Sequence, residues 1–553
     1  MRKSMKLKKR YEITSRGFKL LNQYCPGLVR GKALTALVNA LQPFATIWFS
    51  AQIINEISTA QRINLIILYV SAVILINFAI SVIRSMFEKV SAEKENMMWC
   101  WFSKLISDKQ MSMDYVDIES AEIKQQKKKV EENIFWYGNG LAQLVWGTST
   151  LVNVAVNLIL SVSMTVTLFT SRSGDPIVDN PIWVIIILAL IVLGGFISSK
   201  ANIKENDIFK KWCDRTTWYN RNFHVFGYNI CLNLNYAMDL RIYEQYRITN
   251  RKLDDMISYE KGDHPYTVPM ALYPSLARIL IGIVYACSYV FVVTKAFLGA
   301  FGVGSIVQYV GVLSQFSSGV QDLMYVFADN ETYCGYLQML YDYLDIPNKK
   351  YQGTLPVEKR AFCDDGDFDY EIEFRNVTFK YPGTDVPALD NVSMKFRIGE
   401  RLAVVGMNGS GKTTFIKLLC RLYDPDEGEI LLNGVNIKKY NYEEYMMLFS
   451  VVFQDFQLFS FPLGENVAAN MEYDREKVVE CLEKAGFGER LRTLEHGIGT
   501  HLYKDFEESG VSISGGEAQK IALARALYKT APFIIQCLYV HIGLLSSIFL
   551  FEK

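Results

Sequence analysis

The sequence lacks several signals that mark simple classes of protein. Its ten cysteines include no CxxC pair and no metal-ligand spacing, which argues against a zinc site and a disulfide framework. The 58 basic and 58 acidic residues cancel, so the total charge says nothing about an acidic or nucleic-acid partner. No nucleic-acid partner is expected. No apolar core closely follows the basic opening MRKSMKLKKRYEITSRGFK, so we expect a cytoplasmic tail rather than a cleavable signal peptide. We expect free thiols, a reducing compartment, and a basic tail lying against an anionic membrane surface.

Acidic residues are also scarce near the end of the chain. Between Glu508 and Glu552 the only one is Glu517. The final apolar run, Phe533 to Phe551, is just long enough to cross a bilayer core and also begins like a buried strand. The stretch alone therefore leaves open a membrane span, a buried strand or the loss of a proper ending.

Long apolar runs are present in the first 330 residues, and half of the whole chain is hydrophobic. Six segments are predicted to span a membrane, near 33–57, 64–83, 141–169, 182–197, 275–294 and 303–325. Two polar stretches, near 88–138 and 198–264, are rich in helix formers and are expected to extend the membrane helices. Lys and Arg are dense in the tail and in both stretches, so both termini are predicted to be cytoplasmic.

Polar residues recur at helical spacing inside two of these spans. Asn39 and Gln42 lie on one face of the first span, and Asn153 and Asn157 on one face of the third. Such side chains either hydrogen-bond to neighbouring helices or line a substrate path, and the sequence leaves both open.

The composition changes after Asp345, and strand-like alternation begins near Tyr370. There, the apolar run Leu402–Val405 is followed by Gly406-x4-Gly411-Lys412-Thr413 and an amphipathic helix, which is a P-loop in its required setting. The glycines let backbone N–H groups surround phosphate oxygens, Lys412 reaches the β and γ phosphates, and the Thr413 hydroxyl ligates Mg²⁺. The sequence therefore predicts a nucleotide site.

A second helix start follows about a hundred residues later, in GVSISGGEAQKIALARALYK. Ser514-Gly515-Gly516 directly precedes an Ala-rich helix, where Ser514 can cap the helix or contact an anion. Alone, this pattern is typical of an ordinary helix start.

Six spans, a P-loop and SISGGE together resemble the ATP-binding cassette (ABC) transporters, specifically an exporter-type half-transporter. The resemblance implies an all-α six-helix transmembrane domain followed by an α/β P-loop (RecA-like) nucleotide-binding domain. It implies ATP-dependent export of a small molecule, lipid or peptide, with a second half-transporter as partner. The expected location is the plasma membrane, with the N-terminus and nucleotide-binding domain in the cytoplasm. The expected boundaries are a tail at 1–30, a membrane domain at 31–330, a linker at 331–369 and a nucleotide-binding domain at 370–553.

The family's motifs fall on particular residues. Tyr381, in VTFKYPG, matches the aromatic residue that stacks on adenine, and Gln454, in VVFQD, matches the Q-loop glutamine. ISGGE resembles the LSGGQ signature, with Ser514 and Gly516 meeting the γ-phosphate of ATP. The implied ATP contacts are Tyr381, Gly406, Asn408, Gly409, Ser410, Gly411, Lys412, Thr413, Thr414, Gln454, Ser514, Gly515 and Gly516, and the implied Mg²⁺ ligands are Thr413 and Gln454. The resemblance also implies two coupling helices, at 114–121 and about 220–231.

The resemblance stops at the strand that normally ends in Walker B. APFII begins this strand, but QCLYVHIG follows where an Asp-Glu pair belongs, and His541 is too close to be the switch histidine. No catalytic residue is identified. We expect a frameshift or truncation after about residue 535. The two alternatives are a seventh membrane span and a tail that completes the sheet as strand and helix. An alternative function is a partner subunit that binds ATP without hydrolysing it.

Overall fold

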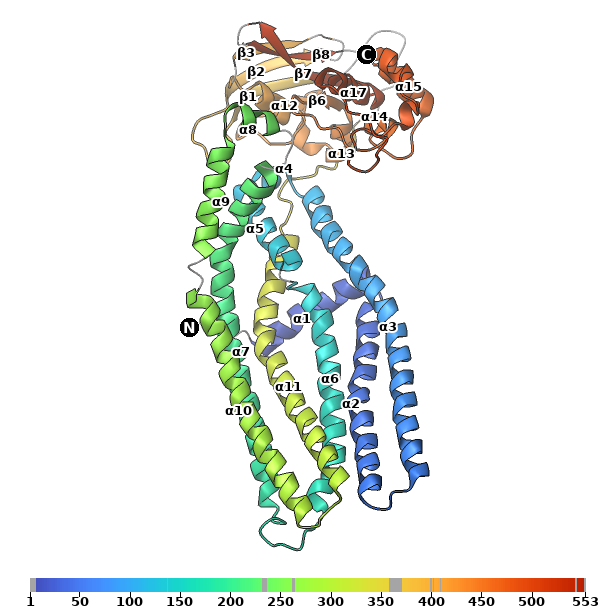
Figure 1. Cartoon of the computed structure of the whole chain (residues 1–553). Coiled ribbons are helices and arrows are strands. Elements are labelled where there is room, and N and C mark those ends of the chain that lie inside the picture. The colour runs from blue at the N-terminus through green and yellow to red at the C-terminus, as the bar shows by residue number, and fades with distance from the viewer. Residues whose placement is uncertain are drawn as a thin grey trace. The chain divides into compact units, whose positions relative to one another are not determined.

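The computed structural model describes residues 6–136, 138–230, 236–260, 264–357, 370–397, 400, 402–407, 409–542 and 545–551. The chain divides into two compact units (Figure 1). Unit 1 comprises Met1–Met111 and Gln125–Ile346, and unit 2 comprises Ser112–Lys124 and Pro347–Lys553. In the described residues unit 1 is helical, whereas unit 2 combines two four-stranded sheets with helices. The predicted order, a helical region followed by an α/β domain, is confirmed.

Long helices account for most of the first 344 residues. The elements are α1 (Leu7–Tyr24), α2 (Leu28–Ser58), α3 (Ile63–Ser112), α4 (Tyr115–Glu119), α5 (Ala121–Glu131), α6 (Leu141–Thr170), α7 (Ile182–Phe223), α8 (Ala237–Ile242), α9 (Tyr246–Glu260), α10 (His264–Phe297) and α11 (Val303–Leu344), with π-helical turns at Glu132–Trp136 and His224–Ile230. The 50 residues of α3 would extend about 75 Å, more than twice the thickness of a bilayer core. The polar stretches after the second and fourth spans thus continue as helix, as expected.

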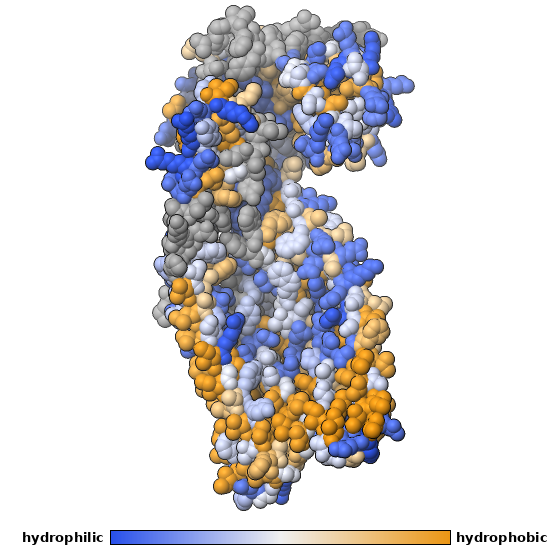
Figure 2. Space-filling view, viewed as in Figure 1, coloured by the Kyte–Doolittle hydropathy of each residue, from blue (hydrophilic) through white to orange (hydrophobic). Residues whose placement is uncertain are grey.

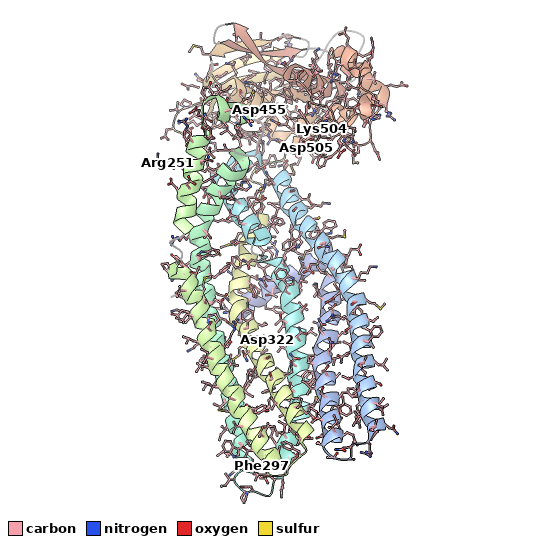
Figure 3. The ribbon with its side chains drawn as sticks, viewed as in Figure 1. Arg251, Phe297, Asp322, Asp455, Lys504 and Asp505 are labelled. Carbon is pink, nitrogen blue, oxygen red and sulfur yellow. The ribbon has the colours of Figure 1, made fainter. Side chains whose placement is uncertain are left out.

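Five helices of the described chain are long and apolar enough to cross a membrane: α2, α3, α6, α7 and α10. The sixth predicted span lies in α11, which packs against α2, α6, α7 and α10 but is not among these five. Gln315, Gln321 and Asp322 lower its hydropathy (Figure 3). Five of the six predicted spans are therefore supported by apolar helices, and the span at 303–325 stays a prediction.

The apolar surface of unit 1 is concentrated at one end. Figure 2 shows hydrophobic residues gathered over the half of unit 1 that contains the short connections α2–α3, α6–α7 and α10–α11. The other half, toward the polar extensions of α3 and α7, is coloured mainly pale or blue in this view. This distribution is what helices that leave a bilayer at one side would show.

Close backbone approach and buried polar contacts hold the helices of unit 1 together. A Cβ on Gly304 would lie 2.1 Å from the backbone oxygen of Ala51, so α11 and α2 meet without a side chain between them. The Gly304 N–H donates to Asn55 Oδ1 at 2.8 Å, which satisfies one free amide at the start of α11. At the end of α6, the Leu168 carbonyl accepts a 2.9 Å hydrogen bond from buried Lys295.

The basic N-terminal segment forms a helix that packs on α11. Arg16 donates to both carboxylate oxygens of Asp345 at 2.6 Å, and its guanidinium lies 4.3 Å from the ring centroid of Tyr341. The Tyr341 hydroxyl donates to the Ile13 carbonyl at 3.0 Å. The sequence had indicated only a basic tail, because its apolar positions are few.

Unit 2 contains all the strands of the described chain. They are β1 (Glu371–Phe379), β2 (Leu389–Arg397), β3 (Ala403–Met407), β4 (Glu427–Leu432), β5 (Val435–Asn436), β6 (Phe449–Val452), β7 (Phe533–Ile542) and β8 (Leu545–Phe551). Its helices are α12 (Lys412–Leu419), α13 (Tyr442–Met447), α14 (Leu463–Ala468), α15 (Arg475–Lys484), α16 (Gly488–Arg492) and α17 (Gly515–Tyr528), with 3₁₀ turns at Ile437–Lys439 and Gly497–Gly499.

The strands form two sheets, in the orders β2-β1-β4-β5 and β3-β8-β7-β6. In the second sheet β6 and β7 are parallel, whereas β8 is antiparallel to both of its neighbours. One hydrophobic core joins residues of both sheets to α12, including Phe374, Phe415 and Ile535, all under 5% exposed. The rings of Phe374 and Phe415 are 4.7 Å apart. This packing fixes α12, and with it the P-loop that precedes it.

The apolar tail adds strands to the sheet that carries the P-loop. After Ile535, β7 continues to Ile542, and β8 returns between β7 and β3, pairing Phe549 with Ala403. Within the described residues the tail is thus extended rather than helical, unlike both the seventh span and the strand-and-helix ending considered from the sequence.

Candidate nucleotide site

The P-loop joins β3 to α12 through backbone conformations that favour glycine. Gly409 and Gly411 have φ angles of +85° and +84°, in the left-handed region. A Cβ on Gly411 would lie 2.6 Å from the backbone oxygen of Ala388, so a side chain would displace the loop. The amide of Ser410 donates to the Met407 carbonyl at 3.1 Å and closes the turn. The predicted contact Asn408 lies outside the described residues.

The Lys412 ammonium is held over this loop. Its Nζ donates to the carbonyl oxygens of Gly406 and Met407 at 2.7 and 2.8 Å and lies 3.3 Å from Ser410 Oγ. A Cβ on Gly406 would come within 2.6 Å of Ser410 Oγ, a side-chain oxygen that would have to shift. The arrangement places a positive charge beside the first turn of α12, where free backbone amides attract an anion.

Tyr381 is brought to the same helix from the end of β1. Its hydroxyl lies 3.1 Å from Oγ1 of buried Thr414 in the first turn of α12, while the preceding Thr413 is exposed. The Tyr381 ring packs edge-on against Phe379 at 5.1 Å and Tyr423 at 5.5 Å and remains partly exposed. The structure therefore joins the predicted adenine contact to the P-loop helix.

Gln454 follows β6 at the edge where β6 and β7 both end their parallel pairing. It is exposed, and its backbone hydrogen-bonds to the Cys537 thiol. Burial, and then the charge of Asp455 (Figure 3), raises the pKa of Cys537 to about 11. Gln536 pairs in register with Val452 and is 8% exposed. Gln536 and Cys537 thus lie beside the end of β6, in the segment where the resemblance implies an Asp-Glu pair.

Ser514 caps α17 and is engaged by a residue of the same helix. Its Oγ accepts from the Glu517 amide at 3.3 Å, and Glu517 Oε2 accepts from the Ser514 amide and hydroxyl, both at 2.8 Å. These hydrogen bonds, the amide of Ser514 first, hold the pKa of Glu517 below its usual value. Gly515 and Gly516 are exposed with open space around them. The described contacts of Ser514 are thus with Glu517 rather than with the P-loop.

Comparisons with known proteins agree with this geometry. A sequence profile of the ABC transporter family matches residues 389–536. The subtilin transport ATP-binding protein SpaT of Bacillus subtilis is 25% identical over 510 residues, 90% of this chain and 78% of SpaT. ATP-dependent lipid A-core flippases of Haemophilus ducreyi and Escherichia coli are 38% identical over 200 residues, 36% of this chain and 32% of each flippase. A bacterial Atm1-family ABC exporter with ATP bound has the same fold, with a TM-score of 0.57 at 18% identity, covering 93% of this chain and 85% of that one.

The profile match contains the P-loop, and the alignment with SpaT is long enough to include both units. Residues 389–536 belong to the ABC transporter family, and the chain as a whole resembles its exporter-type members. As in that class, one polypeptide carries both the apolar helices and the ATP-binding cassette, and ATP-dependent export is the function that this membership supports. For the flippases, the chain matches only about a third of their length.

The structure adds contacts to this ABC transporter that its motifs did not indicate. The short helix α4, within the first predicted coupling segment, belongs to unit 2. Glu119 of α4 pairs with Lys417 of α12 at 3.0 Å and accepts hydrogen bonds from the hydroxyls of Tyr115 and Tyr423. Nothing local in the sequence signals a pair separated by 298 residues. The second coupling segment is π-helical over His224–Ile230, and Cys231 lies outside the described residues.

Proposed function

We propose that this chain is one half of a dimeric exporter and binds ATP with Mg²⁺ at the P-loop of unit 2. The observation that carries the proposal is the joined arrangement of β3, α12 and the Lys412 ammonium, with Gly406 and Gly411 at positions that a Cβ would obstruct. Backbone amides and a lysine in this order suit a triphosphate. Tyr381, anchored on Thr414, offers a partly exposed ring to the base.

Two oxygen donors suit Mg²⁺ in this site. Thr413 carries a hydroxyl in the first turn of α12, and Gln454 carries an amide oxygen at the end of β6; both side chains are exposed. Mg²⁺ prefers such oxygen ligands together with phosphate oxygens and water, and when bound it neutralises charge on the phosphates. The proposed ligands are therefore Thr413 and Gln454.

A second subunit would complete the site with its signature segment. Ser514, Gly515 and Gly516 are exposed at the start of α17, a 14-residue helix whose N-terminal amides favour an anion. The Ser514 hydroxyl would have to leave Glu517 in order to donate to a phosphate. We propose that ATP bound by one subunit draws the partner's signature toward it, which is how dimer closure would drive the membrane helices.

Hydrolysis by this chain is proposed to be weak. Neither Gln536 nor Cys537 is a carboxylate, and they occupy the segment where the family has a Mg²⁺-binding aspartate followed by a glutamate. A glutamine cannot supply the negative charge, and a thiol whose pKa is about 11 is no general base at neutral pH. This observation favours a second candidate function, a subunit that binds ATP and lends its signature to a hydrolysing partner.

Peptide export is the transport function that the comparisons favour. SpaT, named for subtilin transport, aligns over 510 residues. The flippase alignments span 200 residues, which is shorter than the expected membrane domain at 31–330, the part expected to select a substrate.

We further propose that the chain lies in the plasma membrane with both termini cytoplasmic. On a cysteine-free background, Arg172→Cys between α6 and α7 should react with an impermeant maleimide from outside, and Lys127→Cys in α5 should not; the reverse pattern would overturn this topology.

Binding of a labelled, non-hydrolysable ATP analogue tests the nucleotide site. With the full chain in nanodiscs and Mg²⁺ present, Lys412→Ala should weaken binding about 10-fold or more, because it removes the ammonium that lies over the loop. Lys439→Ala, an exposed lysine of the same unit, is the matched control and should bind like the unchanged chain. Equal binding by all three proteins would disprove the site.

A further inference from the structure

A single ammonium lies among three tyrosine rings beside the proposed nucleotide site. Lys417 Nζ is 5.4 Å from the ring centroid of Tyr115, 5.5 Å from that of Tyr381 and 5.7 Å from that of Tyr423. These distances are within the range of cation–π attraction. The same ammonium pairs with Glu119 at 3.0 Å. All five residues belong to unit 2, and we call them the tyrosine cage.

The tyrosine cage holds the proposed adenine contact from two points on one helix. Thr414 and Lys417 are three residues apart in α12 and therefore lie on the same face. Thr414 contacts the Tyr381 hydroxyl at 3.1 Å, and Lys417 lies over the Tyr381 ring. One contact holds the hydroxyl and the other lies over the ring, which remains partly exposed.

The other side of the cage is α4, whose Glu119 is ionised at neutral pH. Burial acts to raise the pKa of Glu119, but hydrogen bonds from Tyr423, Tyr115 and Lys417 outweigh burial and leave the pKa below its usual value. The ion pair with Lys417 is partly buried, with side chains 17% and 36% exposed. Because α4 lies between α3 and α5 in the chain, its position is tied covalently to the helices of unit 1.

We propose that Lys417 is a positioning residue for adenine, holding the Tyr381 ring for stacking only while Glu119 of docked α4 holds Lys417. The inference rests on the proposed function of Tyr381 in base binding. It adds that recognition of the base, rather than of the phosphates, is the part of ATP binding that senses whether α4 is in place.

The coupling between α4 docking and adenine stacking can be measured at either site. If docked α4 strengthens adenine stacking, then adenine stacking must strengthen α4 docking by the same factor. ATP should therefore slow hydrogen exchange in residues 115–119, whereas inorganic triphosphate, which occupies the phosphate cradle but has no base, should leave it unchanged. Equal slowing by both ligands would assign the effect to the phosphates and overturn the proposal.

Substitutions in the tyrosine cage supply the main test, with the full chain in nanodiscs and Mg²⁺ present. Lys417→Met removes the charge and keeps the length, and it should weaken ATP binding about 3- to 10-fold, the scale of a partly desolvated cation–π contact, while triphosphate binding stays the same. Lys417→Arg keeps both the cation and the ion pair and should restore ATP binding. A structural role alone would weaken both ligands equally, and that result would refute the positioning role.

Glu119→Gln tests whether the effect reaches α4. It should lower ATP affinity in the same selective way, although Glu119 contacts no part of the P-loop in the described structure. Because both residues act through one contact, Lys417→Met and Glu119→Gln together should cost no more than Lys417→Met alone. Additive losses would mean that the two residues act independently, against the proposal.

Two controls separate this inference from the proposed function. Lys412→Ala must weaken ATP and triphosphate alike; if it weakens neither, the nucleotide site itself is wrong. If it weakens both but Lys417→Met leaves ATP binding unchanged, only the positioning role fails. If Lys417→Met does not fold, Glu119→Gln and Tyr423→Phe, which leave α12 unchanged, test the positioning role instead. The proposal is overturned if neither variant loses ATP binding selectively.

Discussion

The two sides of the proposed nucleotide site differ sharply. On the β3 side, Gly411 and Lys412 are held in a loop geometry that fits a triphosphate. On the β7 side, the buried amide of Gln536 and the thiol of Cys537 lie in the segment where the resemblance implies carboxylates. The two sides come from different strands, so one can be kept while the other is changed. This difference is the basis of the proposal that nucleotide binding and nucleotide hydrolysis are separable in this chain.

The energetic reason for the separation is that the two sides act at different stages. Groups around the phosphates stabilise bound ATP, whereas a Mg²⁺-binding aspartate and a base stabilise mainly the transition state. Changing the second set lowers kcat far more than affinity. The following changes test this contrast, from the largest expected effect to the smallest.

Gly411→Ala should weaken ATP binding by disturbing the P-loop. The residue has a φ of +84°, and its Cβ would lie 2.6 Å from the Ala388 oxygen, so the loop must move; the left-handed conformation alone costs about 1–2 kcal/mol. We expect ATP binding to fall about 10-fold or more, measured by equilibrium binding in nanodiscs. Gly499→Ala, where a Cβ has open space and φ is not positive, is the control. Normal binding by Gly411→Ala would show that the loop tolerates a side chain.

Glu517→Gln should have a smaller effect, of the opposite sign, on dimer formation. The carboxylate holds the Ser514 hydroxyl and adds negative charge where a partner's phosphate is proposed to bind. Replacing it should strengthen ATP-dependent association about 2- to 5-fold, the scale of an exposed charge near a helix N-terminus. Energy transfer between labelled chains would measure association, with Glu480→Gln, exposed on α15, as control. Weaker association would show that the capping box is needed for the signature to work.

Lys350 offers a smaller effect on stability, away from the phosphates. Burial first, opposed by Asp424, lowers its pKa from 10.5 to about 8. The unfolded chain therefore binds more protons between pH 8 and 10.5, and the stability of unit 2 should rise with pH across that window.

Lys350→Met removes this titration. Its unfolding free energy relative to the unchanged chain should be higher at pH 7 than at pH 10.5 by about 1–3 kcal/mol, measured by thermal unfolding in nanodiscs. Lys439→Met, which changes an exposed lysine, should show no such difference. A pH-independent difference for Lys350→Met would mean that the folded chain does not disfavour this charge.

Local sequence patterns predicted the parts of the fold that depend on neighbours in the chain. The apolar run, the spaced glycines and the amphipathic helix around Lys412 define a strand, a loop and a helix within about twenty residues. The capping box could also be predicted, because Ser514-x-x-Glu517 is its pattern. The resemblance of ISGGE to the signature led instead to a predicted phosphate contact for Ser514.

Features that depend on distant residues could not be predicted. The contact of Glu119 with Lys417 joins residues 298 apart, and Arg16 meets Asp345 across 329. The polar character of α11 was visible in Gln315 and Gln321, but its packing against α1, α2, α6, α7 and α10 was not. The strand pairing of the tail likewise depends on β3, more than a hundred residues earlier.

The measurement that tests the account most directly is ATP binding and phosphate release on one preparation of the full chain in nanodiscs, with Lys412→Ala alongside. We predict that the chain binds ATP, that Lys412→Ala binds it about 10-fold or more weakly, and that phosphate release is at least about 10³-fold slower than that of an ABC exporter with an intact Walker B pair. Phosphate release at an ordinary transporter rate, abolished by Lys412→Ala, would contradict the account, because it would require a catalytic group that Gln536 and Cys537 do not provide.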